Sequence, residues 1–163
     1  MNTLQTANQT ETETILEVVS LHQKVKKLPK KLQAFQTTIK SPDDVAAVGK
    51  LAIELIGDYD REVFLVIGVS TKNQISVINK CHVGTVNASL VSPREIMKPL
   101  IMHNCTSYFI FHNHPSFVLV PSPEDLAITE RMAKVGEIMA IELIDSLIVS
   151  DSKYISLKEK GYL

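Results

Sequence analysis

Residues 62–83 read EVFLVIGVSTKNQISVINKCHV, and this stretch decides the class of fold. Glu62 opens an apolar run, Val63 to Val69, that predicts a strand buried on both faces. Residues Ser70 to Asn73 are typical of a turn, and residues 74–83 predict a returning strand. Because a connection this short joins antiparallel strands, the sheet contains at least one antiparallel pair.

Serine–proline pairs mark three helix starts outside this hairpin. Such a pair supplies a capping hydroxyl and a proline at the first helical position, and carboxylates follow in the first turn. Ser92-Pro93-Arg94-Glu95 also matches a capping box. The predicted helices begin at Pro42, Pro93 and Pro123, the last running to about Met139, and further strands are predicted at 15–21, 107–114, 141–149 and 154–157. The sequence thus predicts an α/β fold in which helices flank a mixed sheet.

Length and composition suit one globular domain. The chain has 163 residues, of which 45% are apolar and 21% charged, and its formal net charge is −1. Its apolar runs are shorter than a membrane span, and its two cysteines form no CxxC pair. The first residues lack the basic and apolar regions of a signal peptide. We therefore expect a soluble cytoplasmic protein without a membrane partner.

The amino-terminal region differs in composition from the rest. Residues 1–14 are mostly polar, and we expect them to form a flexible tail before a single domain at 15–163. Five lysines lie between positions 24 and 31. They leave a nucleic-acid partner open, although no aromatic residue lies among them to stack on a base, and a solvated loop explains them as well.

Most residues that could bind a metal or take part in catalysis lie in one stretch, FHNHPSFVLVPSPED, residues 111–125. His112 and His114 lie two apart at a strand end, so strand alternation directs both imidazoles to one face. Asp125 lies in the first turn of the next helix, after a loop that prolines restrict. Two imidazole nitrogens and one carboxylate oxygen leave a fourth tetrahedral position for water, which is the arrangement of a catalytic zinc site.

Two further residues suit a metal-dependent hydrolase. A catalytic zinc needs a proton acceptor that is not itself a ligand, and Glu62 is a carboxylate at the mouth of an apolar strand. Ser122 could donate its hydroxyl to an oxyanion. Each residue also has a structural interpretation: Ser122 as a helix cap, Asp125 as a partner of the helix dipole, and Glu62 as a solvated strand start.

These residues resemble a known family. His112-Asn113-His114-Pro115-Ser116 followed by Pro121-Ser122-Pro123-Glu124-Asp125 is similar to the JAB/MPN (JAMM) metalloprotease signature, and in detail to the RadC family. Further matching stretches are 84–89, Pro93-Arg94-Glu95, Leu143-Ile144-Asp145 and Tyr154 to Leu157 with Gly161. The resemblance extends from about Leu16 to Leu163.

The resemblance implies a cytidine-deaminase-like α/β fold that binds one Zn²⁺ per chain. His112, His114 and Asp125 would be its ligands, Glu62 the general acid/base and Ser122 the oxyanion donor. Related domains cleave peptide or isopeptide bonds, so the expected partner is a peptide or protein substrate.

The sequence departs from the family at three places. Phe117 stands where a glycine is common, Ser146 stands where a histidine usually follows Asp145, and residues 1–50 contain one glycine, Gly49, and no helix-hairpin-helix segment. The residues Phe117 to Val120 form an apolar tip that is either exposed beside the metal site, or covered by a partner, or folded back onto the core.

Two alternatives to a zinc peptidase remain. One is a DNA-repair or mobile-element accessory protein of the RadC type, and the other is a catalytically silent scaffold; formation of a homo-oligomer also stays open. A zinc deaminase would need a P-C-x-x-C ligand pair, and a serine hydrolase a nucleophile-elbow glycine pattern. The sequence has neither. We therefore predict a zinc-dependent peptidase or isopeptidase.

Overall fold

The computed structural model describes residues 42–84 and 91–163. Their elements, in chain order, are α2 (Pro42–Ile56), β1 (Glu62–Val69), β2 (Ile75–Gly84), α3 (Pro93–Met102), β3 (Ser107–Asn113), α4 (Pro123–Met139), β4 (Glu142–Val149) and β5 (Tyr154–Ser156). Each predicted element within these ranges is present, and its bounds differ from the prediction by at most one residue, as is usual at element ends.

The five strands form one mixed sheet in the order β2-β1-β3-β4-β5. β1 pairs antiparallel with both β2 and β3, while β3 and β4 are parallel and are connected through α4. β5 pairs antiparallel with β4 at the other edge. The predicted mixed sheet flanked by helices is therefore confirmed.

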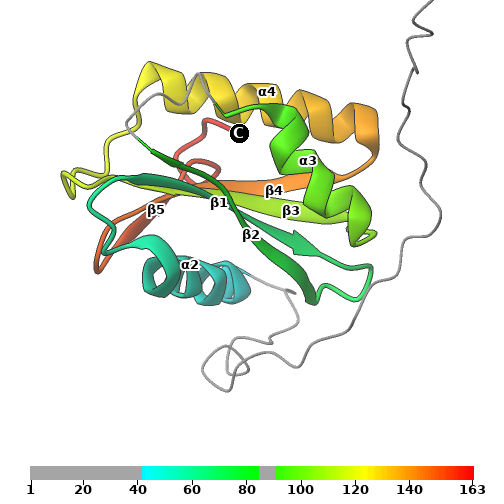
Figure 1. The fold of residues 1–163 in the computed structure, drawn as a ribbon, viewed down its shortest axis with the longest axis horizontal. Coiled ribbons are helices and arrows are strands. Elements are labelled where there is room, and N and C mark those ends of the chain that lie inside the picture. The colour runs from blue at the N-terminus through cyan, green and yellow to red at the C-terminus, as the bar shows by residue number, and fades with distance from the viewer. Residues whose placement is uncertain (1–41, 85–90) are drawn as a thin grey trace, which may run out of the picture.

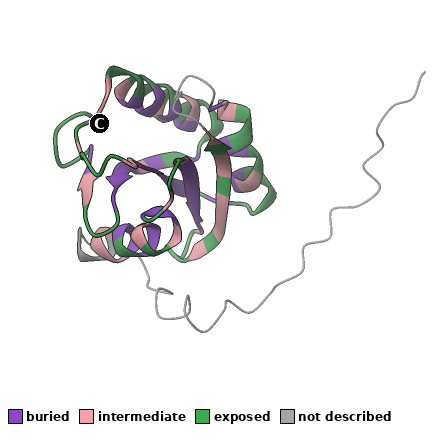
Figure 2. Cartoon of the chain, turned by 60° about the vertical axis from the view of Figure 1, so that its left-hand side comes forward, coloured by how far each residue is buried: buried purple, intermediate pink, exposed green. Residues whose placement is uncertain are grey.

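Helices cover both faces of this sheet. In Figure 1, α2 lies on one side and α3 and α4 lie on the other. Odd-numbered residues of β1, such as Val63 and Leu65, pack with α2, whereas Phe64 and Val66 pack with α3 and α4. This burial on both faces explains why β1 is apolar at nearly every position. In Figure 2 the central strands are largely buried, whereas the edge strand β2 is partly exposed.

The starts of α3 and α4 differ in their caps. At α4, the Ser122 hydroxyl accepts from the Asp125 amide at 3.1 Å, and the Asp125 carboxylate accepts from the Ser122 amide at 2.8 Å. This is a complete capping box. The capping box predicted at Ser92 is wrong, because the Glu95 amide bonds the Ser92 carbonyl oxygen at 3.0 Å instead of the hydroxyl.

Several expectations lie outside the described residues. They are the tail at 1–14, the strand at 15–21, the lysines at 24–31 and most of the matching stretch at 84–89. Within the described ranges, no helix has both the length and the apolar character that crossing a membrane requires.

The topology defines where a site can form. β3 ends at Asn113 and α4 begins at Pro123, and the loop between them returns the chain to the same end of the sheet. Tyr108 and Ile110 of β3 face α4, so alternation also directs His112 to that side. The end of β3 therefore meets the first turn of α4.

Candidate metal centre

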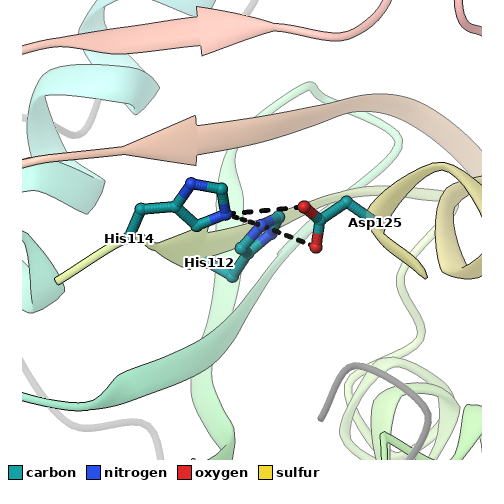
Figure 3. Close-up of side chains that lie close together, drawn as sticks. All are labelled: His112, His114 and Asp125. Atoms are coloured by element: carbon teal, nitrogen blue, oxygen red, sulfur yellow. Dashed lines mark hydrogen bonds and ion pairs between the residues drawn. The ribbon is translucent and has the colours of Figure 1, made fainter. Parts of the chain in front are cut away.

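Three side chains converge where β3 ends and α4 begins. The imidazoles of His112 and His114 and the carboxylate of Asp125 point toward one another (Figure 3), and one ligand atom of each lies within 4.8 Å of the others. The group is well shielded: the side chains of His112 and Asp125 are 6% exposed, and that of His114 is 12% exposed. The structure thus brings together the three residues that the sequence spacing predicted.

The spacing of the donor atoms fits a small tetrahedral ion. His112 Nε2 lies 3.1 Å from His114 Nε2 and 3.0 Å from Asp125 Oδ1, and His114 Nε2 lies 3.4 Å from Asp125 Oδ2. Ligands at about 2.0–2.1 Å from a tetrahedral ion stand about 3.3 Å apart. The two distances to Asp125 run to different oxygens of its carboxylate, and the group as a whole could hold a metal ion.

Neighbouring groups orient two of the three side chains. His114 Nδ1 donates to the Val118 carbonyl oxygen at 2.7 Å, so Nε2 is the nitrogen that faces the other donors. The His114 amide donates to the Val149 carbonyl oxygen at 3.0 Å, which keeps the backbone aligned with β4 beyond the end of β3. Asp125 is fixed by the capping box with Ser122.

Asp125 and His114 stabilise the charged forms of each other. Burial alone would raise the pKa of Asp125, but hydrogen bonds from His112 and His114 hold that pKa well below its usual value. The hydrogen bond to Asp125 raises the pKa of His114, and the negative charge of Glu62 adds to this rise. Asp125 therefore stays ionised at neutral pH, as a metal ligand must.

Glu62 lies on the same face of the sheet as the histidines. Phe64 pairs with His112 across β1 and β3, and their rings stack with centroids 6.1 Å apart. Since Glu62 precedes Phe64 by two residues in β1, alternation directs its side chain to this face. It is partly buried, and its charge acts on His114.

Asn113 is a residue of this region that sequence analysis missed. It is fully buried between the two histidines on the opposite face of β3. Its side-chain oxygen accepts from the Val63 amide at 2.7 Å, and its Nδ2 donates to the carbonyl oxygens of Arg61 and Tyr59 at 3.1 and 3.2 Å. Asn113 thus fixes the backbone on both sides of Glu62. The available signal was a polar residue at an inward-facing position between two candidate ligands.

The two side-chain departures near the site have structural consequences. Ser146 Oγ lies 2.9 Å from Thr129 Oγ1, and the Thr129 hydroxyl donates to the Asp125 carbonyl oxygen at 2.8 Å. Ser146 therefore supports the backbone of the first turn of α4.

Phe117 adopts φ +60°, a left-handed conformation that glycine takes without strain. Phe117, Val118 and Val120 are exposed, so the fully buried interpretation of this loop is wrong.

Replacing Asn113 by alanine should destabilise the fold. The change leaves one buried amide and two carbonyl groups without their partner, so we expect the free energy of unfolding in urea to fall by about 1–3 kcal/mol. Gln74→Ala removes an exposed amide side chain and is the matched control, with an expected change within about 0.5 kcal/mol. Equal stability of the two variants would contradict the role assigned to Asn113.

The chelator-treated protein should lose stability as pH rises from about 6 to 8. The pKa of His114 is raised in the fold, and unfolded histidine titrates near about 6.5. Its stabilising ion pair is thus complete below that value and is lost as pH rises through the higher folded pKa. The pKa of Asp125 is lowered, so its contribution is present above about pH 4 and is lost under more acidic conditions.

Urea unfolding in EDTA across this pH range measures the effect. In His114→Gln the decline between pH 6 and 8 should be shallower, because the histidine whose pKa the fold raises is gone. An unchanged slope in this variant would show that another group causes the decline.

Comparison with known proteins identifies relatives. The family model described as RadC-like JAB domain matches residues 39–162. UPF0758 proteins of Desulfitobacterium hafniense and Desulforamulus reducens are 44% and 41% identical over 125 residues, which are 77% of this chain and 54% of each relative. A UPF0758 protein of Moorella thermoacetica is 39% identical over 139 residues, or 83% of this chain and 59% of the relative.

The chain spans about half the length of the curated relatives it matches. Their names state no activity, so they establish kinship alone. The family match covers both histidines and the first turn of α4, which form the candidate metal centre, and also β1 with Glu62. The chain belongs to the RadC-like JAB domain family.

Proposed function

We propose that this chain is a zinc-dependent hydrolase that cleaves peptide or isopeptide bonds. The observation that carries the proposal is the convergence of His112, His114 and Asp125 with donor atoms 3.0–3.4 Å apart. Membership of the RadC-like JAB domain family supports it. Three protein ligands are typical of catalytic zinc sites, whereas structural sites are closed by a fourth.

The donor set favours zinc over harder cations. Two imidazole nitrogens and one carboxylate suit Zn²⁺, whereas Mg²⁺ and Ca²⁺ prefer oxygen ligands in larger number. When bound, the ion would lower the pKa of a water molecule toward about 7 and polarise a substrate carbonyl. Side chains of the protein would carry out the remaining steps, which are proton transfer and stabilisation of the oxyanion.

Glu62 is the proposed general base and acid. It lies on the face that carries the two histidines but is not part of the three-residue donor group. Its carboxylate would accept the proton of the attacking water and deliver it to the leaving amine. The buried Asn113 amide supports this role, because it holds the backbone on both sides of Glu62.

Ser122 is the proposed oxyanion donor. Its hydroxyl oxygen accepts from the Asp125 amide at 3.1 Å, which leaves the hydroxyl proton free for an acceptor on the substrate. The capping box fixes the serine one helical turn before Asp125 and therefore near the donor group. A donor held in place before reaction stabilises developing negative charge without reorganisation.

Purified protein should contain about one zinc ion per chain, and His112→Ala and Asp125→Ala should each lose it. Each change removes one of three donors to the same ion. Metal content after dialysis against zinc-containing buffer gives the stoichiometry. His103→Ala removes an exposed histidine at the end of α3 and should retain full zinc content. Full zinc content in the Asp125 variant would contradict the ligand assignment.

Glu62→Gln should keep zinc and the fold but lose about two to four orders of magnitude in hydrolysis rate. The amide keeps the size of the side chain and cannot accept the proton, and this is the usual scale of general acid–base catalysis. The readout is hydrolysis of a peptide library with and without chelator. Glu142→Gln changes a glutamate that opens a strand at the opposite end of the sheet and should keep the wild-type rate. Wild-type turnover by Glu62→Gln would end the acid/base assignment.

A further inference from the structure

An apolar surface stands beside the candidate metal centre. Phe117, Val118 and Val120 are 56%, 55% and 68% exposed, and Leu119 between them is partly exposed. These residues, the 117–120 loop, lie in the connection between His114 and Asp125. Consecutive exposed apolar side chains on a domain that buries two apolar clusters indicate a contact with another molecule.

The loop is bonded directly to a donor of the metal centre. The Val118 carbonyl oxygen accepts from His114 Nδ1 at 2.7 Å, and the Phe117 amide donates to the His114 carbonyl oxygen at 2.9 Å. The imidazole thus connects the loop on one edge with the donor group on the other. Side chains of this loop are therefore held next to the site.

The backbone at Phe117 is strained for the residue it carries. At φ +60° a bulky side chain costs free energy that glycine would not. The ring is more than half exposed, so burial within the chain offsets little of this cost. Contact of the ring with a bound molecule would offset it.

The most exposed of the three donor residues is the one bonded to this loop. The His114 side chain is 12% exposed, twice the 6% of His112 and of Asp125. His114 is therefore the most accessible of the three donor residues, and its ring is bonded to the loop. An extended peptide advances about 3.3 Å per residue, so the residues next to a reacting amide would lie against the loop.

We propose that Phe117, Val118 and Val120 form the substrate-binding surface of this site and select polypeptides with a bulky apolar side chain near the scissile amide. This inference rests on the proposed hydrolase function and adds the substrate class to it. A peptide is the occupant that fits the size of the surface. A stable interface between two copies of the chain buries about 800 Å² on each partner, from some 20–30 residues, far more than this loop offers.

Cleavage of blocked octapeptides by the zinc-loaded protein tests the proposal. The peptides differ at one position at a time, which carries leucine, phenylalanine, serine or aspartate. We expect kcat/KM for the best apolar peptides to exceed that of their serine counterparts at least tenfold. Two variants test the loop. Phe117→Gly removes the exposed ring and relieves the backbone strain, and Val120→Ser replaces an exposed apolar side chain by a small polar one. Both keep the loop length. In each variant this preference should fall to about threefold or less, mainly through a higher KM, with zinc content unchanged.

Ile138→Ser is the matched control. Ile138 is an exposed apolar residue, 83% accessible, near the carboxyl end of α4 and so at the opposite end of that helix from Asp125. This variant should keep the wild-type preference. An equal loss of preference in Ile138→Ser, or an unchanged preference in both loop variants, would overturn the proposal.

A binding measurement separates this proposal from the proposed chemistry. Fluorescence anisotropy reports the affinity of labelled forms of the same peptides for zinc-loaded Glu62→Gln protein, with and without Val120→Ser. Apolar peptides that bind at least tenfold more weakly after the loop change support the surface even if no peptide is cleaved. Equal affinity overturns it. Sedimentation that shows a dimer abolished by Val120→Ser would also overturn it, because a second copy would then be the occupant.

Discussion

The antiparallel pairing of β1 with β3 is the constraint on which the candidate site depends. It sets Phe64 opposite His112, so the start of β1 and the end of β3 lie together at one end of the sheet. Alternation then assigns Glu62 and His112 to the face covered by α4, and Asn113 to the face covered by α2. A slip of one residue would exchange the two faces and would separate the histidines from Asp125.

The sequence predicts the local elements well because their signals are local. The apolar run of β1, the turn after it and the serine–proline helix starts each lie within a few residues. The strand order depends on pairs far apart in the chain, such as Phe64 with His112, and a single sequence carries little information about them. The prediction of a capping box at Ser92 was wrong for a local reason. The Ser92 hydroxyl and carbonyl oxygens compete for the Glu95 amide, and the carbonyl accepts its hydrogen bond.

The donor group was predictable because strand alternation and a helix start place all three residues. Asn113 was not, since its partners are backbone atoms of residues 59–63, and a sequence pattern does not show which backbone groups need a partner. The support that Ser146 gives to α4 through Thr129 likewise depends on the packing of α4 against β4. The strain at Phe117 was suggested by the glycine common in related domains, and the left-handed backbone bears out that suggestion.

Asp125 contributes both to the fold and to the candidate metal centre. Its carboxylate completes the cap of α4 through the Ser122 amide and also contacts both imidazoles. The helix cap, the histidines and the helix dipole all favour its ionised form. The same contacts orient the carboxylate, so the fold itself determines the geometry of the three donors. Small zinc-dependent domains, in contrast, fold only when the metal binds. In this domain two buried apolar clusters pack on the two faces of the sheet, so the stability of the fold does not rest on the metal centre alone.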